Sequence, residues 1–145
     1  MAAIPYLRRA NYYETDHMGV VHHSNYIRWF EEARIDLLKQ HGVNYRELEQ
    51  RGILIPVVDV FCSYLHSVRF DDVVEIHLTM TRYTGVRMCF AYEVRFSDGT
   101  IAAKGTSTHC FLSPEGKPLA LKRVNQELDT LFTALVRNEQ NTNHT

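Results

Sequence analysis

Residues 12 to 34 read YYETDHMGVVHHSNYIRWFEEAR and contain the features on which the rest of the chain depends. Asp16 lies in a short polar segment, and two adjacent histidines, His22 and His23, follow it. From Ser24 onward apolar residues recur every three or four positions, which predicts an amphipathic helix. The stretch therefore predicts a loop carboxylate close to the electropositive, amino-terminal end of a helix.

The predicted helix covers residues 24–40 and is the first long helix of the chain. Ser24 is the expected N-cap, because its hydroxyl can accept a hydrogen bond from an unpaired amide of the first turn. Gly42 follows two basic residues, and this order predicts the end of the helix. A shorter helix is predicted over residues 45–50.

After these helices the apolar pattern changes from a helical period to alternation, which is typical of strands that bury one face. Val74, Ile76 and Leu78, for example, alternate with Glu75 and His77. Short turns between the later segments favour antiparallel pairing. The predicted strands cover residues 4–12, 53–66, 73–82, 86–96 and 100–112.

The carboxy-terminal part of the chain contains a turn, a helix and a polar tail. Asp98 and Gly99 predict a tight hairpin turn in which both residues favour positive φ. Residues 125–136 predict a second amphipathic helix, and the polar residues 137–145 predict a tail without regular structure. We therefore expect a single domain over residues 1–136.

These elements together predict an α+β fold. A curved five-stranded antiparallel sheet is expected to pack its apolar face on the long helix, with a further helix at the C-terminus. An open sheet of this kind has two exposed edges, and pairing with a second copy of the chain would cover one of them. We therefore expect a homodimer, or a tetramer made of two such dimers.

Composition and charge exclude several classes of partner. The 145 residues carry a formal net charge of −1, so the chain lacks the cationic field that attracts nucleic acid or an anionic membrane surface. No apolar run approaches the ~18 residues needed to span a bilayer. Cys62, Cys89 and Cys110 are odd in number and widely spaced, which indicates free thiols in a reducing compartment. We therefore expect a cytoplasmic protein.

Asp16 has two interpretations when only the residues around it are considered. Aspartates in loops commonly accept a hydrogen bond from their own backbone, and such a residue has a structural role. A carboxylate a few residues before a helix can also face a carbonyl group that free helix amides polarise, and can attack it or activate a water molecule. The pattern by itself leaves both interpretations open.

The histidines of the same stretch raise the alternative of a metal site. Zinc requires three or four converging ligands, which usually include a second cluster elsewhere in the chain. His22 and His23 are adjacent and cannot easily both face one ion, and His17 has no CxxC or HxxxH partner motif. We therefore expect no metal.

The opening stretch also carries a family resemblance. The segment YETDHMGVVHHSNY, residues 13–26, runs into Trp29-Phe30-Glu31 and Ala33-Arg34 and resembles the signature of the 4-hydroxybenzoyl-CoA thioesterase family, in particular its YbgC-like acyl-CoA thioesterases. The resemblance continues through the Phe70-Asp71-Asp72 turn to about Leu112. It implies the hotdog fold and hydrolysis of an acyl-CoA thioester to a free carboxylic acid and coenzyme A, without a metal or organic cofactor.

The same resemblance implies roles for individual residues. Asp16 is implied to be the catalytic carboxylate, either as nucleophile or as general base. The backbone amide of His23 is implied to polarise the thioester carbonyl. Tyr13 is expected to support the loop beside the substrate. The family's active site lies between two subunits, so Ser63 and Tyr64 of the partner subunit are expected to line the acyl pocket.

Coenzyme A phosphates would require cationic partners. Arg82 and Arg87 flank a predicted turn and are candidates for this role, although arginines on the solvent face of a strand are more often simply solvated. Two other functions remain open. A hotdog dehydratase or hydratase would use a histidine with an acidic partner, such as His23 with Glu31 or Glu32. A hotdog domain that only binds acyl-CoA would have no catalytic group.

Overall fold

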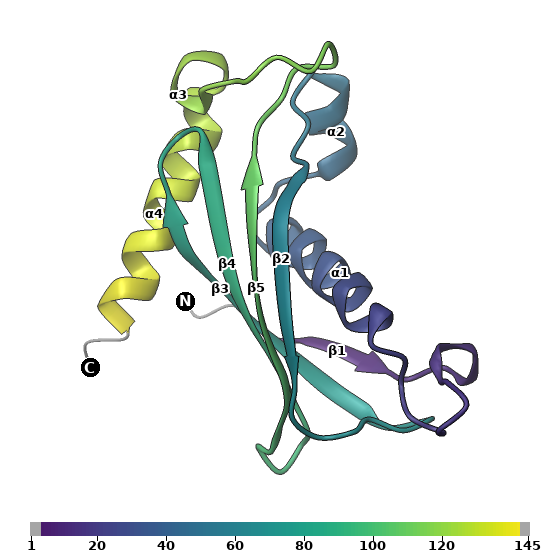
Figure 1. The fold of residues 1–145 in the computed structure, drawn as a ribbon. Helices are drawn as coiled ribbons and strands as arrows, with labels where there is room; N and C mark the ends of the chain where they lie inside the picture. The colour runs from purple at the N-terminus through teal and green to yellow at the C-terminus, as the bar shows by residue number, and fades with distance from the viewer. Residues whose placement is uncertain (1–3, 143–145) are drawn as a thin grey trace. The chain divides into compact units, whose positions relative to one another are not determined.

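The computed structural model of the chain describes residues 4–142, and their side chains as far as residue 138. Its centre is a five-stranded sheet with the strand order β1-β3-β4-β5-β2 (Figure 1). Strand β1 pairs antiparallel with β3, with Tyr6 opposite Ile76 and Arg9 opposite Val73. The strands are β1 (Tyr6–Arg9), β2 (Val57–Tyr64), β3 (Val73–Tyr83), β4 (Arg87–Arg95) and β5 (Ile101–Cys110).

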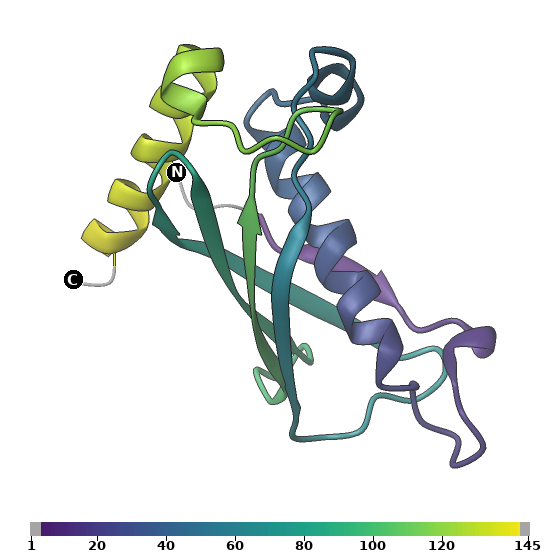
Figure 2. The same ribbon diagram turned by 45° about the horizontal axis from the view of Figure 1, so that its top comes forward.

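The helices confirm the predicted positions of the two amino-terminal helical segments and add two elements. A short 3₁₀ turn, η1, precedes the long helix, and a four-residue helix, α3, precedes the last one. Both views show the long helix α1 beside the short strand β1 (Figure 1, Figure 2). The helical elements are η1 (Tyr12–Glu14), α1 (Ser24–Gln40), α2 (Tyr45–Gln50), α3 (Leu121–Val124) and α4 (Gln126–Thr142).

The predicted α+β fold with a curved, antiparallel, five-stranded sheet is therefore confirmed. The alternation of apolar and polar residues in the sequence corresponds to an alternation of buried and less buried side chains in the strands. In β3, Val74, Ile76, Leu78 and Met80 are buried while the residues between them are only partly so. The reason is the two-residue repeat of a strand, which places every second side chain on the same face.

The first strand is shorter than predicted, because it covers Tyr6–Arg9 and not residues 4–12, of which Tyr12 begins η1. Three further local predictions are wrong. Ser24 is the first residue of α1 and not its N-cap, which is His23. At the hairpin after β4 only Gly99 takes a positive φ, of 90°. The amide of Gly99 donates to the carbonyl of Phe96, so the turn is the longer kind with a single left-handed residue at its end.

The third correction concerns the C-terminus. Helix α4 continues to Thr142, whereas the sequence predicted a helix ending at residue 136 and a tail without regular structure from residue 137. The apolar repeat ends near Val136, but no glycine or proline follows to stop the helix. A polar helical turn can continue from an already formed helix because propagation is far easier than nucleation. Residues 143–145 lie outside the described residues.

The contacts of the chain form two compact units. The first comprises the chain as far as Val43 together with Phe61–Leu78 and Tyr92–Gly105. The second comprises Asn44–Val60, Thr79–Ala91 and the chain from Thr106. This division does not test the expectation of one domain over residues 1–136, which stays a prediction.

The first unit packs α1 on the sheet through aromatic rings. Phe30 of α1 stacks on Tyr92 of β4 with ring centroids 4.1 Å apart, and both side chains are fully buried. Gly105 of β5 makes this approach possible, because a Cβ there would lie 2.5 Å from the Phe30 ring. In the second unit the core contains Phe111 and Phe132, whose rings also stack, at 6.3 Å.

Candidate active site

A short, tightly hydrogen-bonded loop places Asp16 near the start of α1. Thr15 and Val21 form an antiparallel bridge, and the amide of Asp16 donates to the carbonyl of Val20 at 2.8 Å. Gly19 closes the loop with a φ of 79°, a value that side chains other than glycine's rarely adopt. The chain therefore reverses between residues 16 and 20 and enters α1 only three residues beyond the bridge.

The carboxylate of Asp16 is held by its own loop. Its Oδ1 accepts a hydrogen bond from the amide of Met18 at 2.9 Å, which confirms the structural interpretation of a turn aspartate. Asp16 is half-buried, and within residues 4–142 no partner is recorded for its Oδ2. The turn therefore occupies one carboxylate oxygen and leaves the other available to a ligand.

The start of α1 presents a free amide beside this loop. His22 accepts the amide of Ser24 on its ring Nδ1 at 3.2 Å, and its carbonyl accepts the amide of Asn25 at 3.0 Å. Within the described part of the chain no acceptor is recorded for the amide of His23, whose side chain is exposed. An unpaired amide at the electropositive end of a helix can stabilise an oxyanion.

A glutamate that the sequence did not single out connects these parts. Glu14 is only 3% exposed, and its carboxylate accepts hydrogen bonds from Arg8, from the amide of Asn11 and from the indole of Trp29. The sequence gives little warning of this, because Glu14 lies in a polar-looking segment. The signals that the sequence offers are Arg8, six residues before Glu14, and Trp29, fifteen residues after it. Only the fold brings these side chains to one carboxylate.

The other predicted site residues of the first unit, Tyr64, Ser63 and Tyr13, differ in their partners and exposure. Tyr64 of β2 donates its hydroxyl to the carbonyl of His23 at 2.9 Å and therefore lies at the start of α1 in the same chain. Ser63, beside it, is half-buried. Tyr13 of η1 is 79% exposed, and its hydroxyl accepts a hydrogen bond from Asn11 at 3.0 Å.

Two phenol hydroxyls and a thiol lie near this end of the helix: Tyr26 is buried, Tyr64 is exposed and Cys62 is half-buried. Burial raises the pKa of Tyr26 to about 12. Burial, together with a hydrogen bond to Cys62, raises the pKa of Tyr64 to about 12 as well. Burial also raises the pKa of the Cys62 thiol. Both phenols therefore stay protonated at neutral pH, and the hydroxyl of Tyr64 donates to the carbonyl of His23.

The predicted phosphate-binding arginines belong to the second unit. Arg82 and Arg87 lie on either side of the turn between β3 and β4, and both are exposed. The interpretation that they contact coenzyme A stays a prediction, as does the placement of Ser63 and Tyr64 across a subunit boundary.

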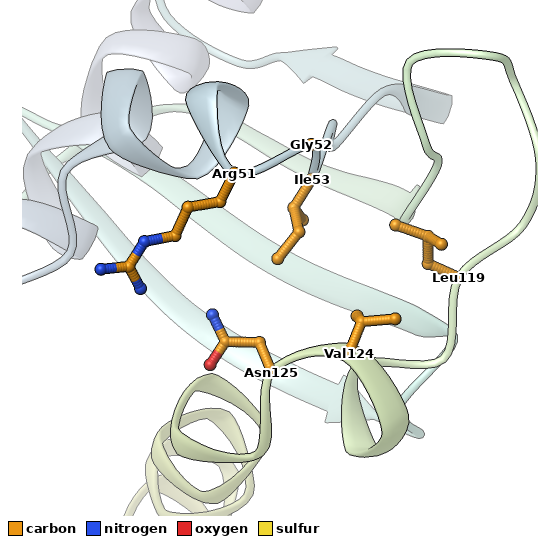
Figure 3. A pocket seen from close by; sticks show the side chains of 6 residues that line it. All are labelled: Arg51, Gly52, Ile53, Leu119, Val124 and Asn125. Carbon is orange, nitrogen blue, oxygen red and sulfur yellow. The ribbon is translucent and has the colours of Figure 1, made fainter.

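A cavity of about 330 Å³ lies elsewhere in the second unit (Figure 3). It is formed where the end of α2 faces the junction of α3 and α4, and none of the predicted site residues lines it. Asn125, on its wall, accepts the amide of Leu128 at 3.1 Å and so caps the start of α4. The lining residues are Arg51, Gly52, Ile53, Leu119, Val124 and Asn125.

The structure bears on two of the alternatives. Within the described residues no three His, Cys, Asp or Glu side chains gather in a way that could hold a metal ion. Glu32, one acidic partner considered for His23, instead bonds to Arg8 and to the hydroxyl of Tyr6.

No helix within residues 4–142 has the length and apolar character to cross a membrane.

Comparison with known proteins places this loop and fold in a family. The chain is 32% identical to YneP of Bacillus subtilis over 122 residues, which are 83% of this chain and 88% of that protein. It is 27% identical over 116 residues to a protein of Escherichia coli named acyl-CoA thioester hydrolase YbgC, covering 79% of this chain and 87% of that one.

The fold agrees with these sequence relationships. A crystal structure of a DHNA-CoA thioesterase from Staphylococcus aureus superposes with a TM-score of 0.90 at 29% identity, covering 97% of this chain and 94% of that one. The predicted hotdog fold is thereby confirmed. Residues 11–128, which include the Asp16 loop and most of the sheet, match the family described as the thioesterase-like superfamily. The chain belongs to this superfamily.

Proposed function

We propose that the protein hydrolyses acyl-CoA thioesters to a carboxylic acid and free coenzyme A, with Asp16 as the catalytic carboxylate. One observation carries the proposal. The Asp16 loop, whose carboxylate has one free oxygen, leads within a few residues to the start of α1, where the amide of His23 is free. The E. coli relative named acyl-CoA thioester hydrolase supports the same reaction class.

The reaction requires one activated oxygen and one stabilised oxyanion. In the general-base form, Asp16 removes a proton from water while the new C–O bond forms at the thioester carbonyl. The carbonyl oxygen then becomes an oxyanion that the amide of His23 stabilises. When the intermediate collapses, the C–S bond breaks and the thiolate of coenzyme A leaves with a proton. In the nucleophilic form Asp16 itself attacks, the C–S bond breaks, and coenzyme A leaves as a thiolate, so that an anhydride of the acyl group and Asp16 is formed. Water then hydrolyses this anhydride, which frees the carboxylic acid and Asp16 and supplies the proton that the thiolate takes up.

No metal or organic cofactor is part of the proposal, because a thioester is already activated towards attack at its carbonyl. Tyr64 acts by holding the carbonyl of His23, and thereby the peptides on either side of it, at the helix start. Arg82 and Arg87 are proposed contacts for the phosphates of coenzyme A.

The proposal includes a homodimer in which strand β2 of one chain lies against β2 of another. Strand β2 is an edge of the sheet, and unpaired edges favour pairing with a second chain. It also carries exposed apolar side chains, which a second copy would cover. These are Val57, Val58, Phe61 and Tyr64. In such a dimer, residues of the partner subunit's β2 would complete the acyl pocket.

The decisive experiment is a thiol-release assay with a panel of acyl-CoAs of short, long, branched and aromatic acyl groups. The wild-type protein should release free coenzyme A from at least one member. Asp16→Asn should lose most of that activity, because an amide can neither attack nor accept the proton. An Asp16→Asn variant as fast as the wild type on every substrate would overturn the mechanism.

The dimer is tested separately by size-exclusion chromatography with light scattering. The wild-type protein should elute as a dimer or as a multiple of two chains. A charge introduced into the exposed edge by Phe61→Glu should shift it towards the monomer. A wild-type protein that is monomeric at micromolar concentration and fully active would contradict a site shared between subunits.

A further inference from the structure

We propose that Glu14 is a positioning residue: its buried carboxylate fixes its own peptide, and the carbonyl of that peptide holds His22 and Asn25 at the start of α1, beside the Asp16 loop. The inference rests on the proposed function for its consequence in catalysis. Its structural part can be tested independently of any activity.

The side chain of Glu14 is saturated with donors. Its Oε1 accepts from Arg8 Nη1 at 3.0 Å and from the amide of Asn11 at 2.8 Å. Its Oε2 accepts from Arg8 Nη2 at 2.9 Å and from Trp29 Nε1 at 2.9 Å. These donors come from β1, from the residue before η1 and from the second turn of α1. Four donors directed at one buried side chain require an ionised carboxylate, which only accepts.

The main chain of Glu14 is used as fully as its side chain. Its carbonyl accepts the amide of His22 at 2.8 Å and the Nδ2 of Asn25 at 2.8 Å. His22 immediately precedes the proposed oxyanion amide of His23, and Asp16 lies two residues after Glu14. One residue therefore holds the chain at both ends of the proposed site, and any shift of its peptide moves the two reacting groups relative to each other.

Arg8 connects Glu14 to a second carboxylate that does not touch the loop. Its Nε donates to Glu32 at 3.0 Å, and Glu32 also accepts the hydroxyl of Tyr6. Burial opposes the charge of Arg8, but its bonds to Glu32 and to Glu14 outweigh burial and raise its pKa above the ordinary value. Glu32 is about one-third exposed, whereas Glu14 is 3% exposed. The network therefore provides a matched control at its outer end.

The experiment compares Glu14→Gln with Glu32→Gln. Glutamine keeps the shape of Glu14 but offers one acceptor oxygen, and its NH₂ group would face two of the donors. Arg8 keeps one carboxylate partner in either variant, so neither leaves an unpaired buried guanidinium. As a second variant, Asn25→Ala removes one hydrogen bond from the carbonyl of Glu14 without changing any charge. Folding of each variant is verified by thermal unfolding.

The first readout is amide hydrogen exchange, which does not depend on hydrolysis. In Glu14→Gln and Asn25→Ala we expect exchange at Asp16, Val21 and His22 to accelerate at least about tenfold, while amides of β4 keep wild-type rates. Glu32→Gln should leave the loop amides unchanged. Loop protection that is equal in the wild type and both Glu14→Gln and Asn25→Ala would overturn the inference.

The second readout separates kcat from KM on the best acyl-CoA. Misplaced reacting groups reduce kcat, so Glu14→Gln should lose about 10²-fold in kcat with KM within about threefold. Glu32→Gln should stay within about twofold in both. If activity instead follows thermal stability across all three variants, Glu14 is merely structural. If the wild type hydrolyses no thioester, the proposed function fails, and the exchange rates alone decide whether Glu14 fixes the loop.

Discussion

Two aspartates of the first unit make the same side-chain hydrogen bond. Asp16 accepts the amide of Met18 on Oδ1 at 2.9 Å, and Asp98 accepts the amide of Thr100 on Oδ1 at 2.9 Å. Each turn also contains a glycine of positive φ, Gly19 at 79° and Gly99 at 90°. Judged by their hydrogen bonds alone, the two aspartates would receive the same interpretation.

Their surroundings differ. The Asp16 loop is tied to a buried glutamate and leads into a long helix whose first amides are partly free. The Asp98 turn joins two strands at a fully solvated tip, where a carboxylate has nothing to act on. A turn aspartate and a catalytic aspartate are therefore not exclusive alternatives. The local motif orients the side chain, and the neighbouring elements decide whether the orientation is useful.

The largest difference between the two aspartates should appear on replacement by asparagine. Asparagine keeps the Oδ1 acceptor in both turns, so both variants should unfold at close to the wild-type denaturant concentration. Asp16→Asn should lose about 10²- to 10⁴-fold in kcat/KM, whereas Asp98→Asn should remain within about twofold. The measurement is thiol release with parallel denaturant unfolding. Equal activities in the two variants would remove the functional distinction.

The two glycines give a smaller effect of the same kind. Alanine at a left-handed position costs about 1–2 kcal/mol, so Gly19→Ala and Gly99→Ala should lower the melting temperature by similar amounts. Only Gly19→Ala should also reduce kcat, by about tenfold, because the amide of Gly19 donates to the carbonyl of Asp16 at 3.0 Å. A Gly99→Ala protein with the same loss of kcat would show that the loss reflects stability.

Tyr64 tests the helix side of the comparison. Tyr64→Phe removes the hydrogen bond to the carbonyl of His23 and should cost about 0.5–1.5 kcal/mol of unfolding free energy, with a two- to tenfold loss of kcat. Because the pKa of Tyr64 is about 12, the phenol stays a donor through the alkaline range. The ratio of wild-type to variant kcat should therefore be constant from about pH 7 to about pH 10. A ratio that falls within this range would contradict the raised pKa.

The smallest effect concerns the stability contributed by Asp98. The amide of Thr100 lowers the pKa of this carboxyl below its ordinary value. A lowered pKa means that the charged form favours the folded state, so its contribution is complete above about pH 4 and disappears as the pH falls through the folded pKa. The melting-temperature difference between wild type and Asp98→Asn should be small at neutral pH and vanish in strong acid. A difference that grows on acidification would have the wrong sign.

Much of the fold could be predicted from periodicity. The three- and four-residue repeat gave the bounds of α1, and alternation placed Val74, Ile76 and Leu78 on the buried face, because these periods are properties of single elements. The errors fell at ends and turns. His23 and not Ser24 caps α1, and α4 extends past its apolar repeat to Thr142, because termination depends on caps and on neighbouring chain more than on period.

The sequence by itself determined the class of fold, the family and the candidate carboxylate Asp16, because periodic burial and a short loop motif are local in the chain. Only the tertiary structure identified Glu14 as the residue that holds this loop. Its partners Arg8 and Trp29 lie six residues before it and fifteen after it, on a strand and a helix, and only folding brings their donors to one carboxylate. The distinction between Asp16 and Asp98 likewise came from what packs around two turns in which the aspartates make the same side-chain hydrogen bond.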